Sequence, residues 1–313
     1  MIHLKVYEKD NKSEWDRFVS VSRNATFLFC RDYMEYHAER FEDHSLMFFD
    51  NKGRLVAMLP GNIDGDTFFS HAGLTYGGFI LAEGATSGIV LEIFDILLKH
   101  LQALNRVSKL IYRPVPWIYH KYPCEEDLYT LFRFGATLCE RKISSVVPMN
   151  NPYPFSSLRM RKVKKAHKHA FSIVQDDCFA DFWPLLEKNL QTKHAAKPVH
   201  SLTEISSLKA IFPENIRLYR VLSGQTTVAG CVLYVSSMVA HVQYISTSEM
   251  GRESGALDYL FLYLMSSEYK DVSFFDFGTS VEQGGYILNE GLIFQKEGFG
   301  GRGVVYDSYQ LVF

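Results

Sequence analysis

A lysine set among glycines near the C-terminus is the part of this sequence best suited to chemistry. Four glycines fall between Gly291 and Gly301, and Lys296 lies among them. Glycines let a backbone approach a ligand closely and leave its N–H groups free to point outward. A lysine there can neutralise a phosphate or polarise a carbonyl. Spacing alone favours a tight hairpin with a solvated lysine, so Lys296 as a catalytic group and Gly300 as a substrate contact are hypotheses.

Groups that could move a proton lie nearby in the sequence. Asp276 ends an apolar segment at Asp276-Phe277-Gly278, and Glu282 and Glu290 follow it. Each carboxylate fits a helix cap or a surface position as well as it fits a catalytic base. Tyr244, on a predicted strand, is a candidate proton donor, although a tyrosine in the core is the simpler interpretation. We keep Asp276 and Tyr244 as catalytic candidates.

Two segments could bind anions. Met250-Gly251-Arg252-Glu253-Ser254-Gly255 precedes a predicted helix, whose first N–H groups form an anion site. Its Arg252 and Gly255 resemble half of the pyrophosphate loop of acetyl-CoA-dependent transferases, but Leu257 occupies the place of the last small residue. A helix cap explains the segment equally well.

The second anion candidate is a basic run. Six lysines and arginines fall within residues 158–169, and Arg161 and Lys164 are the candidate ligands. Such a run is often a solvated helix face, but it could also bind a phosphorylated substrate or a tRNA backbone. Aromatic residues do not interleave with the basic ones, so stacking on single-stranded bases is not indicated.

Other motifs are weak. His194 and His200 flank Lys197-Pro198, and Tyr76 lies in a polar, glycine-rich segment at 70–79. We treat His194 and Tyr76 as candidates for substrate binding. The histidine spacing does not predict a metal site, and neither a Walker loop nor a GxSxG turn is present. The five cysteines include no CxxC pair, which favours buried thiols in a reducing compartment.

Hydrophobic periodicity predicts two halves with a similar order of elements. The first half has predicted strands at 3–8, 45–50, 54–60, 66–70, 109–113 and 136–148, and helices at 12–22, 30–41, 86–104 and 125–134. The second has strands at 172–175, 217–223, 226–236, 240–247, 272–278 and 304–312. Its predicted helices are at 156–169, 178–191, 201–212 and from the turn at 250–255 to 266, and a helical segment lies between the strand at 272–278 and the lysine turn. Antiparallel meanders without intervening helices favour an α/β fold with a mixed sheet, internally duplicated. A Pro- and Asn-rich segment at 150–154 divides the chain into predicted domains 1–150 and 151–313.

Composition limits the class of protein. A chain of 313 residues is longer than a single hydrophobic core usually supports, which favours two domains. A formal charge of −2 argues against a polyelectrolyte partner that binds the whole molecule. The N-terminus lacks a signal-peptide pattern, and the apolar runs are too short for a membrane span. We therefore expect a cytoplasmic protein.

Taken in order, these segments resemble the Fem-type transferases, which consist of two tandem GNAT-like domains. The resemblance rests on Arg161–Ala166 followed by 171–174, Val228–Cys231, Asp276–Gly278, Gly291-Leu292 and Lys296–Gly300, with Trp15, Phe18 and 73–78 near the N-terminus. It implies that Lys296 lies beside the transferred acyl group and that Arg161 contacts a phosphorylated acceptor. It also implies that the strands at 240–247 and 272–278 splay to admit the donor. Gln295 separates Phe294 from Lys296, whereas the family has Phe and Lys adjacent.

The resemblance implies an N-acyltransferase. The donor would be acyl-CoA, acyl-carrier protein or aminoacyl-tRNA, and the acceptor an amine of a cell-wall or surface-glycan compound, such as a peptidoglycan precursor. The long helical hairpin that some Fem enzymes use for tRNA is absent. The alternative is a catalytically inactive module that binds a phosphorylated glycan or a nucleic acid, in which Arg161 and Lys164 matter and Lys296 does not.

Overall fold

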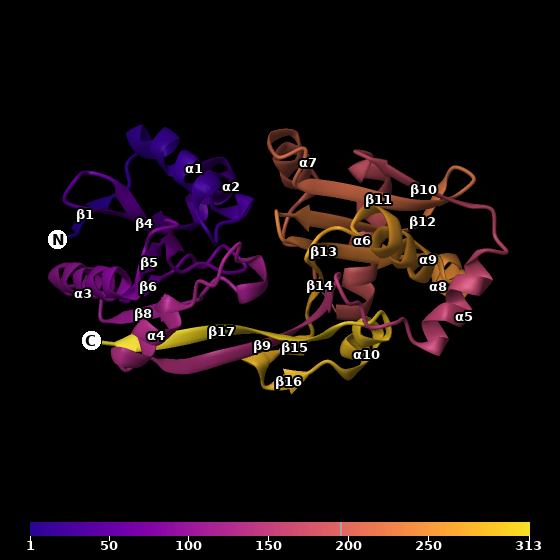
Figure 1. Cartoon of the computed structure of the whole chain (residues 1–313). Helices are drawn as coiled ribbons and strands as arrows, with labels where there is room; N and C mark the ends of the chain where they lie inside the picture. The colour runs from indigo at the N-terminus through magenta and orange to yellow at the C-terminus, as the bar shows by residue number, and fades with distance from the viewer. Residues whose placement is uncertain (195) are drawn as a thin grey trace. The chain divides into compact units, whose positions relative to one another are not determined.

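A computed structural model of the chain describes residues 1–194 and 196–313, without the side chains of residues 193 and 194. It contains two compact units (Figure 1). Unit 1 comprises Met1–Lys142, Gly284–Tyr286 and Val305–Phe313, and unit 2 comprises Ile143–Gln283 and Ile287–Val304. The units differ from the predicted division at residue 150, because the end of strand β17 (Arg302–Val312) pairs with β8 (Lys109–Tyr112) of unit 1. The assignment of 1–150 and 151–313 to two GNAT-like domains stays a prediction.

Unit 1 contains two sheets and one long amphipathic helix. One sheet has the antiparallel order β1-β3-β4-β7, and in the other β17, β8, β6, β5 and β2 are neighbours, with β6 and β8 parallel. Helix α3 (Ser87–Ala103) buries Val90, Ile93, Phe94, Leu97 and Leu101. Of the apolar face that periodicity predicts, Ile93, Leu97 and Leu101 are buried, and Ile89 and Ile96 are half-buried. The remaining elements are β1 His3–Val6, α1 Lys12–Val21, α2 Arg31–Met34, β2 Glu42–Asp43, β3 Leu46–Phe49, β4 Leu55–Leu59, β5 Asn62–Asp64, β6 Thr67–Phe69, β7 Ile80–Leu81 and α4 Glu126–Arg133. Short 3₁₀ turns cover Lys9–Asn11, Phe27–Phe29, Glu35–Arg40 and Trp117–Tyr119.

Unit 2 is built on a sheet of order β10-β11-β12-β13-β14-β9, antiparallel except where β13 pairs with β14. Its strands are β9 Thr137–Pro148, β10 Phe171–Asp176, β11 Ile216–Ser223, β12 Thr226–Val235, β13 Val239–Thr247 and β14 Phe274–Thr279, with a short β15–β16 hairpin at Val281–Glu282 and Ile287–Leu288. Its helices are α5 Ser157–Ala166, α6 Phe179–His194, α7 Leu202–Ile211, α8 Glu249–Ser254, α9 Ala256–Tyr263 with a π-turn at Leu264–Glu268, and α10 Glu290–Gly298.

Strands β13 and β14 form a fork. Their parallel pairing runs only from Val239 and Phe274 to His241 and Asp276, whereas β13 continues to Thr247. Two irregularities part the strands: a bulge in β13 against β12, and a break in the pairing of β14 with β9. A bulge bends its strand and increases its twist. The splaying of these strands that the sequence led us to expect is therefore present.

An aromatic cluster fills one side of the fork. Phe261 of α9, Phe277 of β14 and Phe299 after α10 lie with ring centroids 5.0 to 5.4 Å apart. The Phe277 and Phe299 rings are stacked, with an angle of 19° between them. Packing of this kind stabilises aromatic pairs beyond their buried area. The cluster holds the end of α10 against β14.

Candidate functional site

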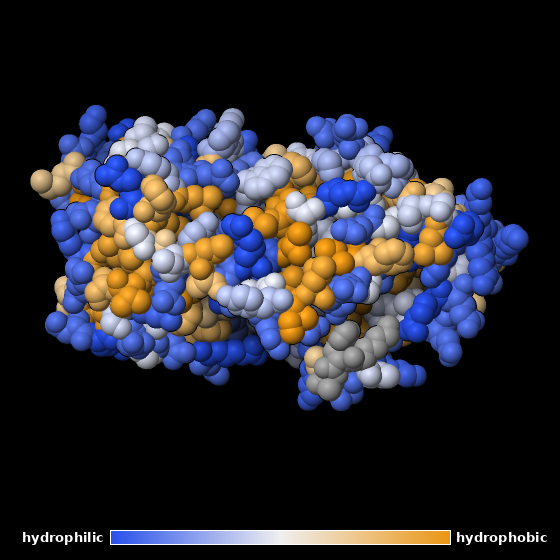
Figure 2. All heavy atoms as spheres, turned by 90° about the horizontal axis from the view of Figure 1, so that it is seen from below, coloured by the Kyte–Doolittle hydropathy of each residue, from blue (hydrophilic) through white to orange (hydrophobic). Residues whose placement is uncertain are grey.

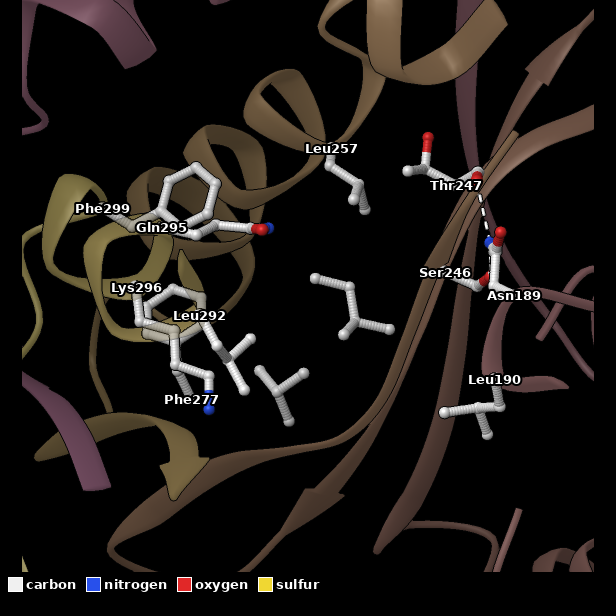
Figure 3. A pocket seen from close by; sticks show the side chains of 12 residues that line it. Asn189, Leu190, Ser246, Thr247, Leu257, Phe277, Leu292, Gln295, Lys296 and Phe299 are labelled. Carbon is white, nitrogen blue, oxygen red and sulfur yellow. Dashed lines mark hydrogen bonds between the residues drawn. The ribbon is translucent and has the colours of Figure 1, made fainter. Parts of the chain in front are cut away.

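A cavity of about 260 Å³ lies in the fork of unit 2. We call it the fork cavity. Figure 3 shows Lys296 on one side of it and Asn189, Ser246 and Thr247 on the other. The rest of its wall is mainly apolar and consists of Leu190, Val242, Ile245, Leu257, Phe277, Leu292, Gln295 and Phe299. A concave, mainly apolar wall with a few polar groups is typical of a small-molecule site.

Lys296 is a buried cation at this cavity. Only 8% of its surface is exposed, and its Nζ donates hydrogen bonds of 2.8 Å to the carbonyl oxygens of Gly278 and Thr279. Burial lowers the pKa of Lys296 to about 8, although the nearby Asp276 carboxylate acts in the opposite direction. An ammonium has three N–H groups, so one remains for a ligand.

The lysine lies on a helix and not in a hairpin. Asn289 caps α10 by accepting a hydrogen bond of 3.0 Å from the Leu292 N–H, and Lys296 is in its last turn. The interpretation of a tight surface hairpin with a solvated lysine is therefore wrong. Phe294 is 64% exposed and does not line the cavity. From this segment the cavity is lined by Leu292, Gln295, Lys296 and Phe299.

The glycines after Lys296 serve packing. The Gly300 N–H donates to the Glu297 carbonyl at 2.9 Å, and the Gly301 N–H donates to that of Lys296 at 3.2 Å. Gly300 has a φ of +94°, and a Cβ on it would lie 2.2 Å from the carbonyl oxygen of Tyr153. Only glycine fits such a position. These N–H groups close the helix instead of pointing toward a ligand, so the position of Gly300 does not support its role as a substrate contact, which stays a prediction.

Asp276 is enclosed by hydrogen bonds. It is 0% exposed, and its Oδ1 accepts from the Ser144 hydroxyl and from the Gly278 N–H. Its Oδ2 lies 2.7 Å from Nδ1 of His241, which keeps 14% of its side chain exposed. A carboxylate so enclosed is not placed for direct contact with a substrate, and its catalytic role stays a prediction. The sequence alone does not indicate His241, because this contact depends on strand register over 35 residues.

Tyr244 does not line the fork cavity. Its hydroxyl lies 2.6 Å from Nδ1 of His200, and its ring contacts Trp183 edge-on with centroids 5.2 Å apart. It is 8% exposed, and these two partners belong to α6 and to the segment before α7. The structure therefore does not bring Tyr244 together with the lysine, and its predicted role as proton donor is not supported by position.

Comparison with known proteins identifies the fold. No family model and no curated protein sequence matches the chain. Among solved structures, FemX superposes with a TM-score of 0.69 at 10% identity, covering 99% of this chain and 97% of FemX. The C-terminal domain of a putative lysylphosphatidylglycerol synthetase from Agrobacterium fabrum has a TM-score of 0.61 at 12% identity, covering 97% and 92%. A tandem GNAT protein from the clavulanic acid pathway has a TM-score of 0.50 at 9% identity, covering 100% and 98%. The chain has a Fem-like tandem GNAT fold.

The expected fold class is thus confirmed. In this Fem-like fold, Arg252 is exposed on α8, away from the fork cavity. Gly255 has a φ of +81°, and a Cβ on it would lie 2.5 Å from the Lys162 carbonyl oxygen. Gly255 therefore allows α8 and α9 to approach α5. The roles of Arg252 and Gly255 in ligand binding stay predictions, and neither residue lines the fork cavity. This segment reaches the cavity only through Leu257.

The basic helix α5 has a buried and an exposed side. Arg161 and Lys164 are exposed and do not line the cavity, and Figure 2 shows hydrophilic surface at the end of unit 2 that carries α5. Arg159 is buried: its Nη1 lies 3.2 Å from Oδ1 of Asp258, and its guanidinium lies 4.7 Å from the Phe299 ring centroid. Burial raises the pKa of Asp258, and the Arg159 charge opposes this shift. Arg159 thus supports a wall of the cavity, and only its position on the face of Val163 and Ala166 could have indicated this.

The last two predicted residues are not at the cavity. Tyr76 is 4% exposed in unit 1, where its hydroxyl donates to Thr26 Oγ1 at 3.1 Å and its ring lies 4.7 Å from that of Tyr119. It is a core residue, so its position does not support its role in substrate binding, which stays a prediction. His194 ends α6, and its side chain lies outside the described residues. In the part of the chain that the structure describes, no group of three or more His, Cys, Asp or Glu could hold a metal ion, and no helix is long and apolar enough to cross a bilayer.

Proposed function

We propose that this protein is an N-acyltransferase that moves an acyl or aminoacyl group from an activated donor to an amine at the fork cavity. The observation that carries the proposal is the buried Lys296 ammonium, held by two carbonyl oxygens at 2.8 Å. Acyl transfer places negative charge on the carbonyl oxygen of the donor, and a fixed cation or N–H donor stabilises that charge most in a water-poor site. The third N–H of Lys296 would serve this oxygen.

The size of the cavity suits the acyl part of a donor. Typical ligand cavities measure about 300 to 1,000 Å³, and the fork cavity, at about 260 Å³, is slightly smaller. It would therefore hold a short acyl or aminoacyl group, while the carrier stays outside. The walls formed by Leu190, Leu257 and Leu292 would contact an uncharged side chain.

Asn189 favours an aminoacyl group. Its Nδ2 donates to Ser246 Oγ at 2.6 Å and to the Thr247 carbonyl at 2.8 Å. A backbone carbonyl can only accept, so Oδ1 is left to accept a hydrogen bond. The α-amino group of an aminoacyl ester would donate to Oδ1, whereas an acetyl group has no such donor.

Two structural neighbours bear on the choice of donor. One structural neighbour is a putative lysylphosphatidylglycerol synthetase, and another is a tandem GNAT protein whose structure was solved without acetyl-CoA. We favour aminoacyl-tRNA over acyl-CoA or acyl-carrier protein because of Asn189. The acceptor would be an amine of a cell-wall or surface-glycan type compound, such as a peptidoglycan precursor. Because these donors are cytoplasmic compounds, the proposed reaction takes place in the cytoplasm.

A transfer assay tests the proposal. Purified protein is mixed with a set of labelled aminoacyl-tRNAs or with labelled acetyl-CoA, together with amine acceptors, and amide product is measured. We expect product from aminoacyl-tRNA and a loss of roughly 100-fold in kcat for Lys296→Met, the usual effect of removing one group that stabilises an oxyanion. The exposed Lys270→Met is the matched control and should retain full activity.

The contrary outcome is also defined. If neither donor yields product, and Arg161→Ala and Lys164→Ala abolish retention on a phosphorylated glycan or a nucleic acid while Lys296→Met does not, the protein is a binding module. The exposed basic side of α5 is the feature that would then carry its function.

A further inference from the structure

We infer that His241, held by Asp276, accepts the proton that the acceptor amine loses during transfer. This inference rests on the proposed function and adds to it a catalytic residue and a positioning residue. His241 and Asp276 form the last pair of residues before β13 and β14 separate. The residues that follow them, Val242 and Phe277, line the fork cavity. Successive residues of a strand point to opposite faces, so His241, which does not line the cavity itself, lies on the other face of β13 from Val242, at the point where the two strands begin to separate.

The hydrogen bonds of Asp276 determine which nitrogen of His241 is free. Asp276 Oδ1 accepts from the Ser144 hydroxyl and the Gly278 N–H, and Oδ2 lies 2.7 Å from His241 Nδ1. A carboxylate only accepts, so Nδ1 of the histidine carries the proton, and the lone pair of the neutral ring is on Nε2. Among the hydrogen bonds of the described residues, Nε2 has no partner, and 14% of the side chain is exposed. Nε2 is thus available as a base.

Gly278 connects this histidine with Lys296. Its φ is +75°, and a Cβ on it would lie 3.3 Å from Cε1 and 4.0 Å from Nε2 of His241. Its carbonyl oxygen accepts the 2.8 Å hydrogen bond from Lys296 Nζ. The edge of the imidazole that bears the lone pair therefore lies beside Gly278, whose carbonyl oxygen binds the ammonium of Lys296. A base and a cation on either side of one residue suit the two ends of one acyl transfer, the amine and the carbonyl oxygen.

The reaction is balanced with these two groups. The amine nitrogen attacks the carbonyl carbon of the donor, a C–N bond forms, and the carbonyl oxygen becomes an oxyanion facing Lys296. The nitrogen loses one proton to His241 Nε2, which makes the ring an imidazolium paired with Asp276. When the oxyanion collapses, the C–O bond of an ester donor, or the C–S bond of a thioester, breaks. The imidazolium returns its proton to the leaving alkoxide or thiolate, and the histidine is neutral again.

Removal of the imidazole tests the inference. We expect His241→Ala to lower kcat by roughly 100-fold or more, the usual contribution of a general base, and to change KM for the donor less than about threefold. Added imidazole should restore part of kcat, because it supplies the missing base. The exposed His167→Ala, just after the end of α5, is the matched control and should neither lose activity nor respond to imidazole.

Further outcomes separate this inference from the proposed function. A His241→Ala variant with full activity, in a protein whose activity Lys296→Met removes, would overturn the role of His241 and leave the proposed function intact. Absence of product from the wild type would instead overturn the proposed function.

The tautomer gives a readout that does not need activity. In ¹⁵N-histidine NMR spectra, assigned by their loss in His241→Ala, neutral His241 should carry its proton on Nδ1. In Asp276→Asn the Nε2-protonated form should increase, because an amide can also donate. A proton on Nε2 in the wild type would contradict the arrangement.

Discussion

The protonation of Lys296 is a prediction at the scale of single residues. Burial lowers the pKa of this lysine to about 8. If its ammonium stabilises the oxyanion, kcat should fall as the pH rises through about 8, since the neutral amine lacks the charge. A pH profile of kcat between 6.5 and 10 measures this, and a rate that stays flat or rises above pH 8 would argue against the cation. The pH at which kcat falls to half should not depend on the pKa of the leaving group. A second donor with a different leaving group checks this.

The same pKa has a consequence for stability. In the unfolded chain the lysine titrates near 10.5, so between pH 8 and 10.5 the unfolded state binds more protons than the folded state. The free energy of unfolding should therefore rise with pH in this window, by up to about 3 kcal/mol for the full shift. Urea unfolding at pH 7.5 and pH 10 should show this rise for the wild type and a smaller one for Lys296→Met. Equal changes in the two proteins would show that the lysine is not buried as a cation.

Single residues also show how far the sequence could lead. The sequence could indicate Lys296 as a candidate site residue, because a lysine among several glycines is unusual. The sequence could not show that Lys296 is buried, because the two carbonyl oxygens that bind its ammonium belong to Gly278 and Thr279, in another segment of the chain. His241 was not predictable as a partner of Asp276, since one residue of register shift would place the two side chains on opposite faces.

At the scale of elements, α5 separates two kinds of arginine. Arg159 and Arg161 are two positions apart, so they point to different sides of the helix. Arg159→Ala leaves the Asp258 carboxylate buried without its partner, and removes the cation over Phe299, so we expect a loss of about 3 kcal/mol in the free energy of unfolding. Arg161→Ala, at an exposed position, should change it by less than about 0.5 kcal/mol. Denaturant unfolding of both variants gives the comparison, and similar losses would contradict the packing of this helix.

The elements themselves were largely predictable, with α10 as the instructive exception. Strands β11 to β13 and helices α3 and α6 follow from their periodicity. In the segment of α10 the glycines suggested a hairpin. The signals of a helix were nevertheless present: Asn289 at the N-cap, Glu290 in the first turn and Gly300 in a left-handed conformation just past the end. Glycines that follow a lysine can end a helix as well as cradle a ligand.

At the scale of the whole molecule, the sequence could not show at which residues the two compact units begin and end. The proline- and asparagine-rich segment after residue 150 looks like a linker, yet β9 before it pairs with β14 through Val146, Val147 and Pro148. Such pairing joins segments more than a hundred residues apart and has no local signal. Strand β9, whose Ser144 donates a hydrogen bond to Asp276, therefore lies outside the predicted domain 151–313.

This difference leads to a prediction about fragments. Fragment 143–304 contains all of unit 2, whereas fragment 151–313 lacks the part of β9 that covers β14. Without β9 the edge of β14 is unpaired, and the buried side chains of Val147 and Met149 are missing from the core. Each such side chain contributes about 1.5 to 3 kcal/mol, so fragment 151–313 should melt at least about 10 °C lower, or without a cooperative transition. Circular dichroism during heating measures both fragments. Equal melting temperatures would show that β9 is dispensable, and would favour residue 150 as the true start of the domain that carries Lys296.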